Sequence, residues 1–219
     1  MSKHSYTAAS PFVEKLNVDG RHLFFTADTH FCHANIIRYC NRPFDSIEEM
    51  NETLIANWNR VVGPDDTVYH LGDFGMGTAL GPNGEPQTLA DIAYRLNGKI
   101  HLIIGNHDLS PLNDSNYRSR FASLQYQVIL EIGRQTIILN HYPMLCYDGA
   151  YDSKRHTWQF FGHVHSGPLN PIPDPPAYDL PRLAHLFDTQ YDVGVDNNGF
   201  APVSLETIRM KMANRPPRV

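Results

Sequence analysis

Residues 23–30 read Leu23-Phe24-Phe25-Thr26-Ala27-Asp28-Thr29-His30 and place two metal-competent side chains directly after an apolar segment. The run 23–27 is short and apolar, which predicts a buried β-strand. A carboxylate and an imidazole follow where that strand ends. Because open α/β sheets bind ligands beyond the carboxyl ends of their strands, this stretch predicts a sheet edge that holds a site.

The same pattern recurs at four further predicted strand ends. The segments that follow these strands are Gly72-Asp73, Gly105-Asn106-His107-Asp108, Asn140-His141 and Gly162-His163-Val164-His165. Taken singly, a Gly-Asp or Asn-His pair is usually a turn, and His-x-His on a strand is usually a polar surface pair. Together and in this order, they predict one functional site. The glycine before three of these segments allows a tight turn and a close approach of the backbone.

Helical patterns alternate with these strands in the first half of the sequence. Ser46-Ile47-Glu48-Glu49 is a capping box that opens a helix ending near Gly63-Pro64, and Thr88 with Asp91 opens a second helix that Gly98 ends. Further predicted strands are residues 67–71, 100–104, 128–132, 136–139, 158–161, 191–195 and 203–208. Helices between strands, followed by a run of strands, predict an α/β sandwich of two sheets.

The bulk composition is that of a compact globular chain. With 42% hydrophobic residues, residues 1–219 are expected to form a single domain with a sizeable core. Proline-rich residues 167–182 are expected to form a surface loop, and residues 209–219 a polar tail. The sequence has no apolar leader, no membrane-length stretch and no CxxC spacing among its three cysteines, so we expect a cytoplasmic protein with reduced thiols. The net charge of -5 argues against nonspecific binding to nucleic acid.

The side chains at the strand ends indicate what kind of metal site they form. They are two carboxylates, one amide and four imidazoles: Asp28, Asp73, Asn106, His30, His141, His163 and His165. A structural zinc site would favour cysteines and four ligands, whereas this larger mixed set suits two divalent ions, such as Mn²⁺, Fe or Zn²⁺. Two such ions, two carboxylates and a bridging hydroxide leave a charge of about +1, which attracts a phosphate anion. A Ser-His-Asp site for acyl transfer fits worse, because the sequence has no Gly-x-Ser-x-Gly motif.

These motifs resemble the five signature blocks of the calcineurin-like metallophosphoesterases, and they span residues 28–165. The segment 28–37, with Asn41-Arg42-Pro43-Phe44, resembles a small bacterial and phage branch of that superfamily. The resemblance implies a four-layer αββα sandwich of two mixed β-sheets flanked by helices. It implies that one metal is held by Asp28, His30 and His165, the other by Asn106, His141 and His163, with Asp73 bridging them. It also implies that His107 is the catalytic histidine, which donates a proton to the leaving oxygen or stabilises the transition state, and that Asp108 orients its ring by a hydrogen bond.

One departure from the family pattern narrows the expected activity. Protein phosphatases of the superfamily extend the second block to Gly-Asp-x-x-x-Arg-Gly, whereas here Gly72-Asp73 is followed by Phe74-Gly75-Met76-Gly77. We therefore expect a hydrolase of small phosphodiesters or phosphomonoesters that uses a metal-bridging hydroxide, rather than a serine/threonine protein phosphatase. A nuclease and a non-catalytic metal-binding scaffold are the alternatives, and the sequence indicates neither a membrane nor a protein partner.

Several polar residues near the blocks allow more than one interpretation. His33 and Arg42 either contact substrate phosphate or are an exposed histidine and a surface arginine. His70 is expected to be a hydrogen-bonded core histidine, and Cys32 a buried neutral thiol. Asp196-Asn197-Asn198-Gly199 predicts a turn, unless its aspartate supports one of the ligands.

Overall fold

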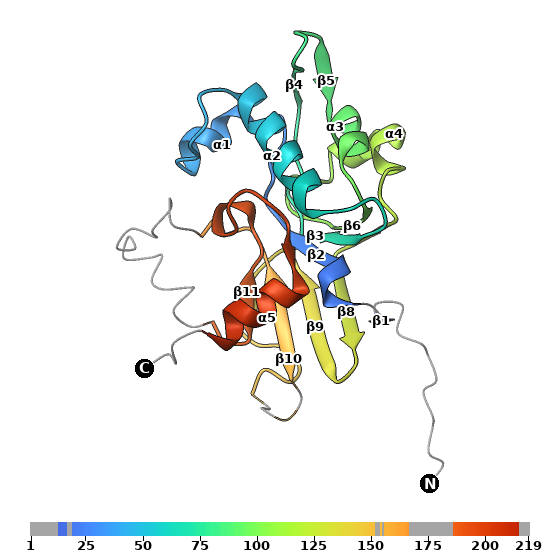
Figure 1. Cartoon of the computed structure of the whole chain (residues 1–219), viewed down its shortest axis with the longest axis vertical. Helices are drawn as coiled ribbons and strands as arrows, with labels where there is room; N and C mark the ends of the chain where they lie inside the picture. The colour runs from blue at the N-terminus through green and yellow to red at the C-terminus, as the bar shows by residue number, and fades with distance from the viewer. Residues whose placement is uncertain (1–12, 17–18, 152–153, 155, 167–185, 215–219) are drawn as a thin grey trace.

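The computed structural model describes residues 13–16, 19–151, 154, 156–166 and 186–214 (Figure 1), and the proline-rich segment 167–182 lies outside them. These residues form two five-stranded sheets and a small hairpin. The first sheet has the order β12 (Val203–Ser204), β2 (Leu23–Thr26), β3 (Thr67–His70), β6 (Lys99–Ile103) and β7 (Ser123–Gln125). The second has the order β1 (Val13–Lys15), β8 (Gln127–Ile132), β9 (Gln135–Asn140), β10 (Thr157–Phe161) and β11 (Gln190–Asp192).

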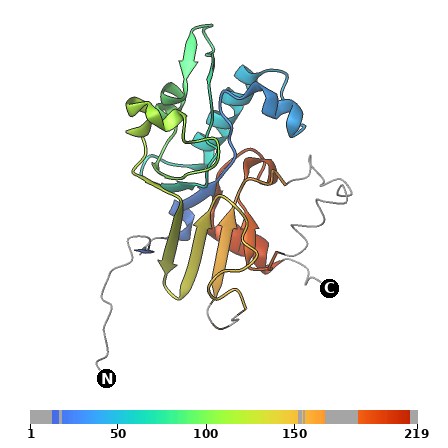
Figure 2. The same cartoon turned by 180° about the vertical axis from the view of Figure 1, so that it is seen from behind.

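Both sheets are mixed. In the first, β2, β3, β6 and β7 run parallel, and β12 joins β2 in the antiparallel sense. In the second, β8 and β9 form the predicted antiparallel hairpin, while β1, β10 and β11 add parallel neighbours. The hairpin β4 (Thr78–Leu80) and β5 (Pro86–Thr88) projects from the end of the molecule near α3, as the view from behind shows (Figure 2).

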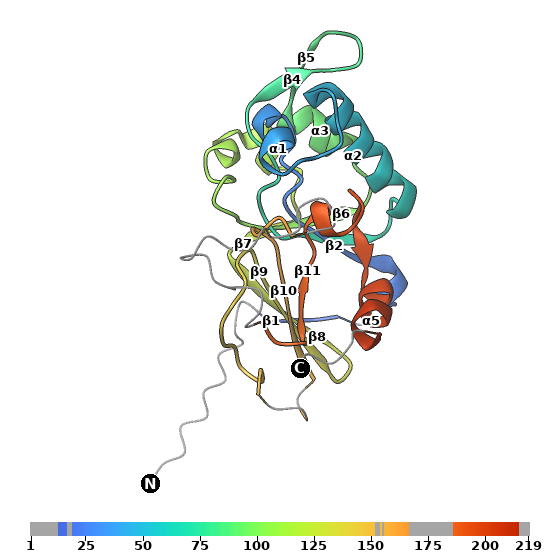
Figure 3. The same cartoon turned by 90° about the vertical axis from the view of Figure 1, so that its left-hand side faces the viewer.

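Helices pack against both cores of the sandwich. They are α1 (Ala34–Tyr39), α2 (Ile47–Val61), α3 (Leu89–Arg95), α4 (Ser115–Arg118) and α5 (Leu205–Ala213). The side view shows α1, α2 and α3 on one side of the first sheet and the second sheet on its other side (Figure 3). The expected α/β fold of two mixed sheets flanked by helices is confirmed. None of the described helices is long and apolar enough to cross a membrane.

Alternation along β2 divides the interior into two cores. Phe24 packs with Val68 and with Trp58 of α2 in the helix-side core, whereas the next residue, Phe25, packs in the core between the sheets. Leu139 of β9 faces Phe25 across that second core, so the first sheet is buried on both faces. Because both faces of this sheet are buried, its strands are held in place, and so are the strand ends that carry the polar segments.

The two helices predicted from capping signals are confirmed. Ser46 Oγ accepts the backbone N–H of Glu49 at 3.1 Å at the start of α2. Thr88 and Asp91 make both reciprocal bonds of a capping box at the start of α3. Because each cap satisfies backbone donors that the first turn leaves free, these short signals were enough to locate the helix starts.

The strand predicted at 203–208 is wrong beyond its first two residues. Only Val203–Ser204 pair with β2, and the chain then turns into α5, which includes residues 209–213 of the expected polar tail. Ser204 Oγ accepts the N–H of Thr207 and caps the helix, while Leu205 and Ile208 bury the same face three residues apart. The strand predicted at 191–195 is likewise shorter, since β11 ends at Asp192 and a 3₁₀ turn covers Val195–Asn197.

Candidate metal centre

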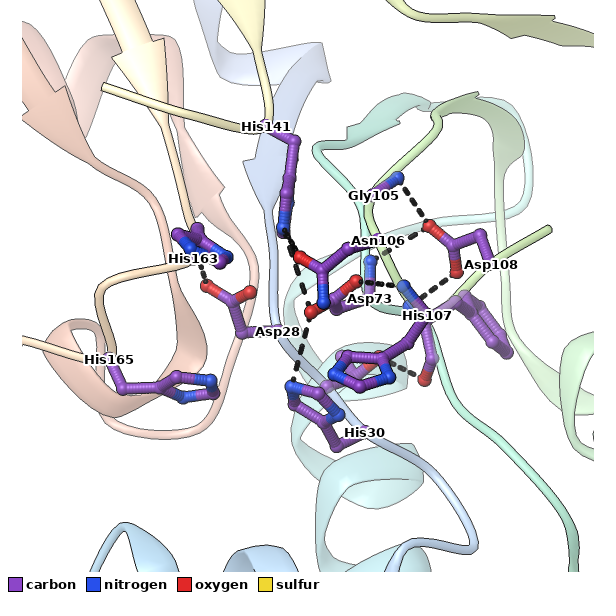
Figure 4. A network of polar contacts seen from close by, with 12 residues as sticks. Asp28, His30, Asp73, Gly105, Asn106, His107, Asp108, His141, His163 and His165 are labelled. Atoms are coloured by element: carbon purple, nitrogen blue, oxygen red, sulfur yellow. Dashed lines mark hydrogen bonds and ion pairs between the residues drawn. The ribbon is translucent and has the colours of Figure 1, made fainter. Parts of the chain in front are cut away.

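The polar segments predicted from the strand ends meet at one edge of the two sheets (Figure 4). The first sheet brings Asp28 and His30 after β2, Asp73 after β3, and the segment 105–108 after β6. The second sheet brings His141 after β9 and the segment 162–165 after β10. Residues more than 130 positions apart are thereby joined, since the His163 N–H donates to Asp28 Oδ2 at 2.8 Å.

The backbone at this edge is strained, and it is closely packed at its glycines. Left-handed φ angles between 50° and 71° occur at five predicted ligands, Asp28, His30, Asp73, His163 and His165. Such angles are uncommon outside glycine and gather at functional sites. A Cβ at Gly105 would lie 2.4 Å from Asp73 Oδ1, and one at Gly162 would lie 2.6 Å from Asp28 Oδ2. The expectation that glycines here allow close approach of the backbone is confirmed.

Two clusters of potential ligands lie side by side. In one, ligand atoms of Asp28, His30 and His165 lie within 4.8 Å of one another, and in the other so do those of Asp73, His141 and His163. Asp73 Oδ2 lies 3.6 Å from Nε2 of His30 and 3.6 Å from Nε2 of His141, which places this carboxylate between the clusters. Asn106 joins the second cluster, with its Oδ1 3.1 Å from His141 Nε2.

The protein leaves donor atoms of this site without partners of their own. Asp28 is fully buried, and its Oδ1 has no hydrogen-bond partner. Both ring nitrogens of His30 are buried and equally unpaired. Burial raises the pKa of Asp28 well above its ordinary value and lowers that of His30 well below it. Since unpaired buried polar atoms are costly, and since oxygen and imidazole donors suit divalent ions, these residues fit a metal centre.

His107 lies at this site, but Asp108 does not act on its ring as expected. Asp108 Oδ2 accepts the N–H groups of Asp73 at 2.8 Å and Gly105 at 2.7 Å, and its Oδ1 accepts that of Phe74 at 2.9 Å. The hydrogen bonds of Asp108 therefore go to backbone amides, which ties the loops after β3 and β6 together. Burial raises the pKa of Asp108 to about 6, against the lowering effect of these amides. The His107 N–H donates to Asp73 Oδ1 at 2.9 Å.

Arg42 is not the surface or substrate-contacting arginine that the sequence suggested. Its side chain is buried, and Nε and Nη2 form a two-pronged ion pair with Asp196 at 2.8 and 2.9 Å. Nη2 also donates to the Asp28 carbonyl at 2.6 Å, and Nη1 to the Thr29 carbonyl at 2.9 Å. With its donors used by the protein, Arg42 holds the turn after β2 rather than a substrate.

Asp196 supports a predicted ligand as well as forming part of a turn. Its Oδ2 lies 2.8 Å from Nδ1 of His165, which orients the ring of a residue that also belongs to the cluster with Asp28. Although burial raises the pKa of Asp196, the hydrogen bond from His165 and the charge of Arg42 outweigh it and lower that pKa. The sequence contained one signal for this role, an aspartate directly after the apolar run Val193–Val195, where the predicted turn begins.

The remaining predicted residues divide between the site and the core. The half-buried His33 ring lies 5.4 Å from that of His30 and 6.2 Å from that of His107, beside the clusters. His70 is buried and hydrogen-bonded to Thr29 Oγ1 at 2.9 Å, and Cys32 is a buried free thiol, both as expected. Burial lowers the pKa of His70 to about 3 and raises that of Cys32 to about 11.

Two hollows open on the described surface. One, of about 460 Å³, is lined by His107 and by side chains from segments 76–78, 88–89 and 110–117. The other, of about 470 Å³, lies at the β8–β9 turn, at the opposite end of β9 from His141, and contains none of the predicted site residues. Of these two hollows, the first contains a residue of the predicted site, His107.

Two sheets with metal-competent clusters at their carboxyl ends are the framework of a metal-dependent hydrolase of phosphate esters. Residues 22–167 match the family model described as calcineurin-like phosphoesterase, and the chain belongs to this family. The family's chemistry is the metal-dependent hydrolysis of phosphate esters.

Similar proteins occur in archaea, phages and bacteria. An uncharacterized protein of Methanocaldococcus jannaschii, MJ1445, is 35% identical over 188 residues, which cover 86% of this chain and 89% of that protein. The gene 66 protein of Mycobacterium phage L5 is 32% identical over 197 residues, covering 79% of this chain and 86% of the phage protein. Among solved structures, AQ665 from Aquifex aeolicus, a protein of unknown function, aligns with a TM-score of 0.60 and 25% identity, over 86% of this chain and 98% of that one.

Proposed function

We propose that the protein is a dinuclear metal-dependent phosphoesterase that hydrolyses small phosphodiesters or phosphomonoesters. The observation that supports this most directly is the pair of ligand clusters that flank Asp73. A single ion at the cluster with Asp73 would leave the buried Oδ1 of Asp28 without a partner, which is unfavourable for a carboxylate.

Each metal has its own ligands in this proposal. Asp28, His30 and His165 would hold one, Asn106, His141 and His163 would hold the other, and Asp73 would be shared by both. When bound, two divalent cations supply Lewis-acid polarisation of the phosphoryl oxygens and a water of lowered pKa. The protein contributes the fixed positions of these ligands, because the strained turns that carry them are tied by Arg42 and Asp108.

His107 supplies the proton for the leaving group. As water adds to phosphorus and releases one proton to solvent, the bond from phosphorus to the ester oxygen breaks and a proton passes from the His107 ring to the departing alkoxide; His107 then regains a proton from solvent. The backbone of His107 is fixed by its N–H bond to Asp73 Oδ1, so the ring starts from a residue anchored to the proposed bridging ligand. In this scheme His33, whose ring lies near those of His30 and His107, contacts the phosphate oxygens.

The proposal is tested with protein stripped by a chelator and reloaded with Mn²⁺, Zn²⁺ or Fe²⁺. Hydrolysis of 4-nitrophenyl phosphate and bis(4-nitrophenyl) phosphate is measured together with the number of metal ions per chain. We expect turnover that depends on metal and two bound ions per chain. Asp73→Ala should lose both the turnover and the bound ions. Asp65→Ala, which removes an exposed carboxylate, is the matched control. Turnover retained in Asp73→Ala would contradict the scheme.

A further inference from the structure

The groove of about 460 Å³ beside His107 presents mainly apolar surface. Its walls come from the connection between β3 and β4, the start of α3, and the segment that leads into α4. Apolar surface is contributed by Met76, Leu89, Pro111 and the ring of Tyr117. A volume of this size lies in the range of pockets that bind small organic groups.

The charges around this groove disfavour anionic ligands. Among the described residues that line it, none is a lysine or an arginine. Its carboxylate is that of Asp114, which caps α4 by accepting the N–H groups of Asn116 at 2.8 Å and Tyr117 at 3.4 Å. An anionic group in the groove would meet this negative charge with no lysine or arginine in the lining to offset it, which is unfavourable.

His107 lines the groove as well as the metal-competent site, which fixes the direction from which a substrate enters. The proton that His107 donates goes to the oxygen of the departing alcohol. The organic group attached to that oxygen must therefore extend to the His107 side of the phosphate, where the groove begins.

We propose that this groove is the leaving-group subsite and that it accepts an uncharged alcohol with an apolar body, such as an aryl group, while disfavouring anionic ones. This inference rests on the proposed function and deepens it, because it specifies the substrate class. Esters whose leaving group carries further phosphates, including polynucleotides cleaved on that side, are poor substrates in this scheme.

The test uses three phosphonates, which cannot be hydrolysed because a P–C bond replaces the ester bond. Methylphosphonate, phenylphosphonate and 4-carboxyphenylphosphonate are titrated calorimetrically into the Mn²⁺-loaded protein. Burying the ring should make phenylphosphonate bind roughly tenfold more tightly than methylphosphonate. The added carboxylate of the third probe should remove most of that gain.

Two variants and one control assign these differences to the groove. Ser110→Trp places a large ring in the groove from an exposed residue that makes no capping bond, and it should remove the preference for phenylphosphonate. Ala56→Trp introduces the same large ring at an exposed position of α2 outside the groove lining. It should leave the preference for phenylphosphonate intact. Asp114→Asn keeps a good helix cap without the charge, so it should restore binding of 4-carboxyphenylphosphonate alone.

The outcomes separate this inference from the function on which it rests. Equal affinities for methyl- and phenylphosphonate, in a protein that still hydrolyses esters, overturn the leaving-group subsite alone. A phenyl preference that survives Ser110→Trp overturns it too, because the ring must then lie elsewhere. If the metal-loaded protein binds none of the three phosphonates, the proposed function fails and the inference fails with it.

Discussion

Replacing Asp196 with asparagine keeps the size of the side chain but removes the charge that Arg42 and His165 share. In the structure, Asp196 Oδ1 accepts Arg42 Nε at 2.8 Å, while Oδ2 faces Arg42 Nη2 at 2.9 Å and His165 Nδ1 at 2.8 Å. An asparagine offers only one acceptor oxygen, and its NH₂ group, itself a donor, would face the donor groups of Arg42 or His165. The Arg42 side chain is fully buried, so the variant leaves its charge in the interior without a counter-ion.

The size of the effect follows from this burial. Breaking a buried ion pair by removing one partner costs about 3–5 kcal/mol of unfolding free energy. For a chain of this length, each kcal/mol lowers Tm by about 2–4 °C, so Asp196→Asn should lower Tm by roughly 6–20 °C. The loss of the bond that orients the His165 ring should also weaken metal binding by about 10–100-fold at the cluster with Asp28.

Calorimetric unfolding in a chelator measures the first effect free of any metal contribution. Metal titration measures the second, and one of the two ions should be weakened while the other keeps its affinity. Asp65→Asn, at an exposed position, is the control for loss of a carboxylate. The double variant Arg42→Met with Asp196→Leu separates the two roles, because an apolar pair should restore much of the stability without restoring the metal affinity.

Different results would contradict each of the two roles assigned to Asp196. An unchanged Tm in Asp196→Asn would mean that the buried pair contributes no stability. Wild-type affinity for both ions would mean that Asp196 does not position His165. Recovery of metal binding in the double variant would show that stability alone, and not the hydrogen bond to Nδ1, controls the cluster.

Three further changes test other parts of the site. Gly105→Ala should abolish binding of at least one metal ion, because its Cβ would lie 2.4 Å from Asp73 Oδ1, whereas Gly81→Ala, whose nearest atom would be 3.5 Å away, should not. His107→Asn should lower kcat by about 10²–10⁴-fold with metal content unchanged, and an unaltered kcat would remove its role as proton donor. Burial lowers the pKa of His70 to about 3, so its ring stays neutral in the folded protein. In the unfolded chain the ring takes up a proton below about pH 6.5, so the stabilising contribution of His70 is lost as pH falls. In metal-free protein, His70→Phe should therefore reduce the pH dependence of unfolding free energy between pH 4 and 6 by about one proton, and an identical slope would contradict this.

The ligand segments could be predicted from the sequence because each depends on local information. An apolar run of four or five residues defines a strand, and the polar residues that follow it must lie at the strand's carboxyl end. Asp28 after β2 and His141 after β9 needed no knowledge of which strands pair. The capping signals at Ser46 and Thr88 were local in the same sense, since each satisfies donors within three residues.

The partners of the supporting residues could not be predicted, because they are distant in sequence. Arg42 and Asp196 are 154 positions apart, and no local pattern relates them. Asp108 was assigned to its neighbour His107, whereas the fold offers it three backbone amides on two loops. At 203–208 the apolar spacing fits a strand and a helix alike, and the cap at Ser204 together with packing of Leu205 selects the helix.

The buried carboxylates at this edge differ in how far the protein satisfies them, and that difference distinguishes ligands from supports. Both oxygens of Asp108 and of Asp196 accept hydrogen bonds from the chain, so these residues are complete without a metal. Asp28 accepts one bond on Oδ2 and none on Oδ1, while Asp73 accepts one bond on Oδ1 and its Oδ2 lies 3.6 Å from two imidazole nitrogens. Because burying an unsatisfied carboxylate oxygen is costly, a fold retains one where something else completes it. The unmet capacity of Asp28 therefore argues for metal at this residue independently of the family motif.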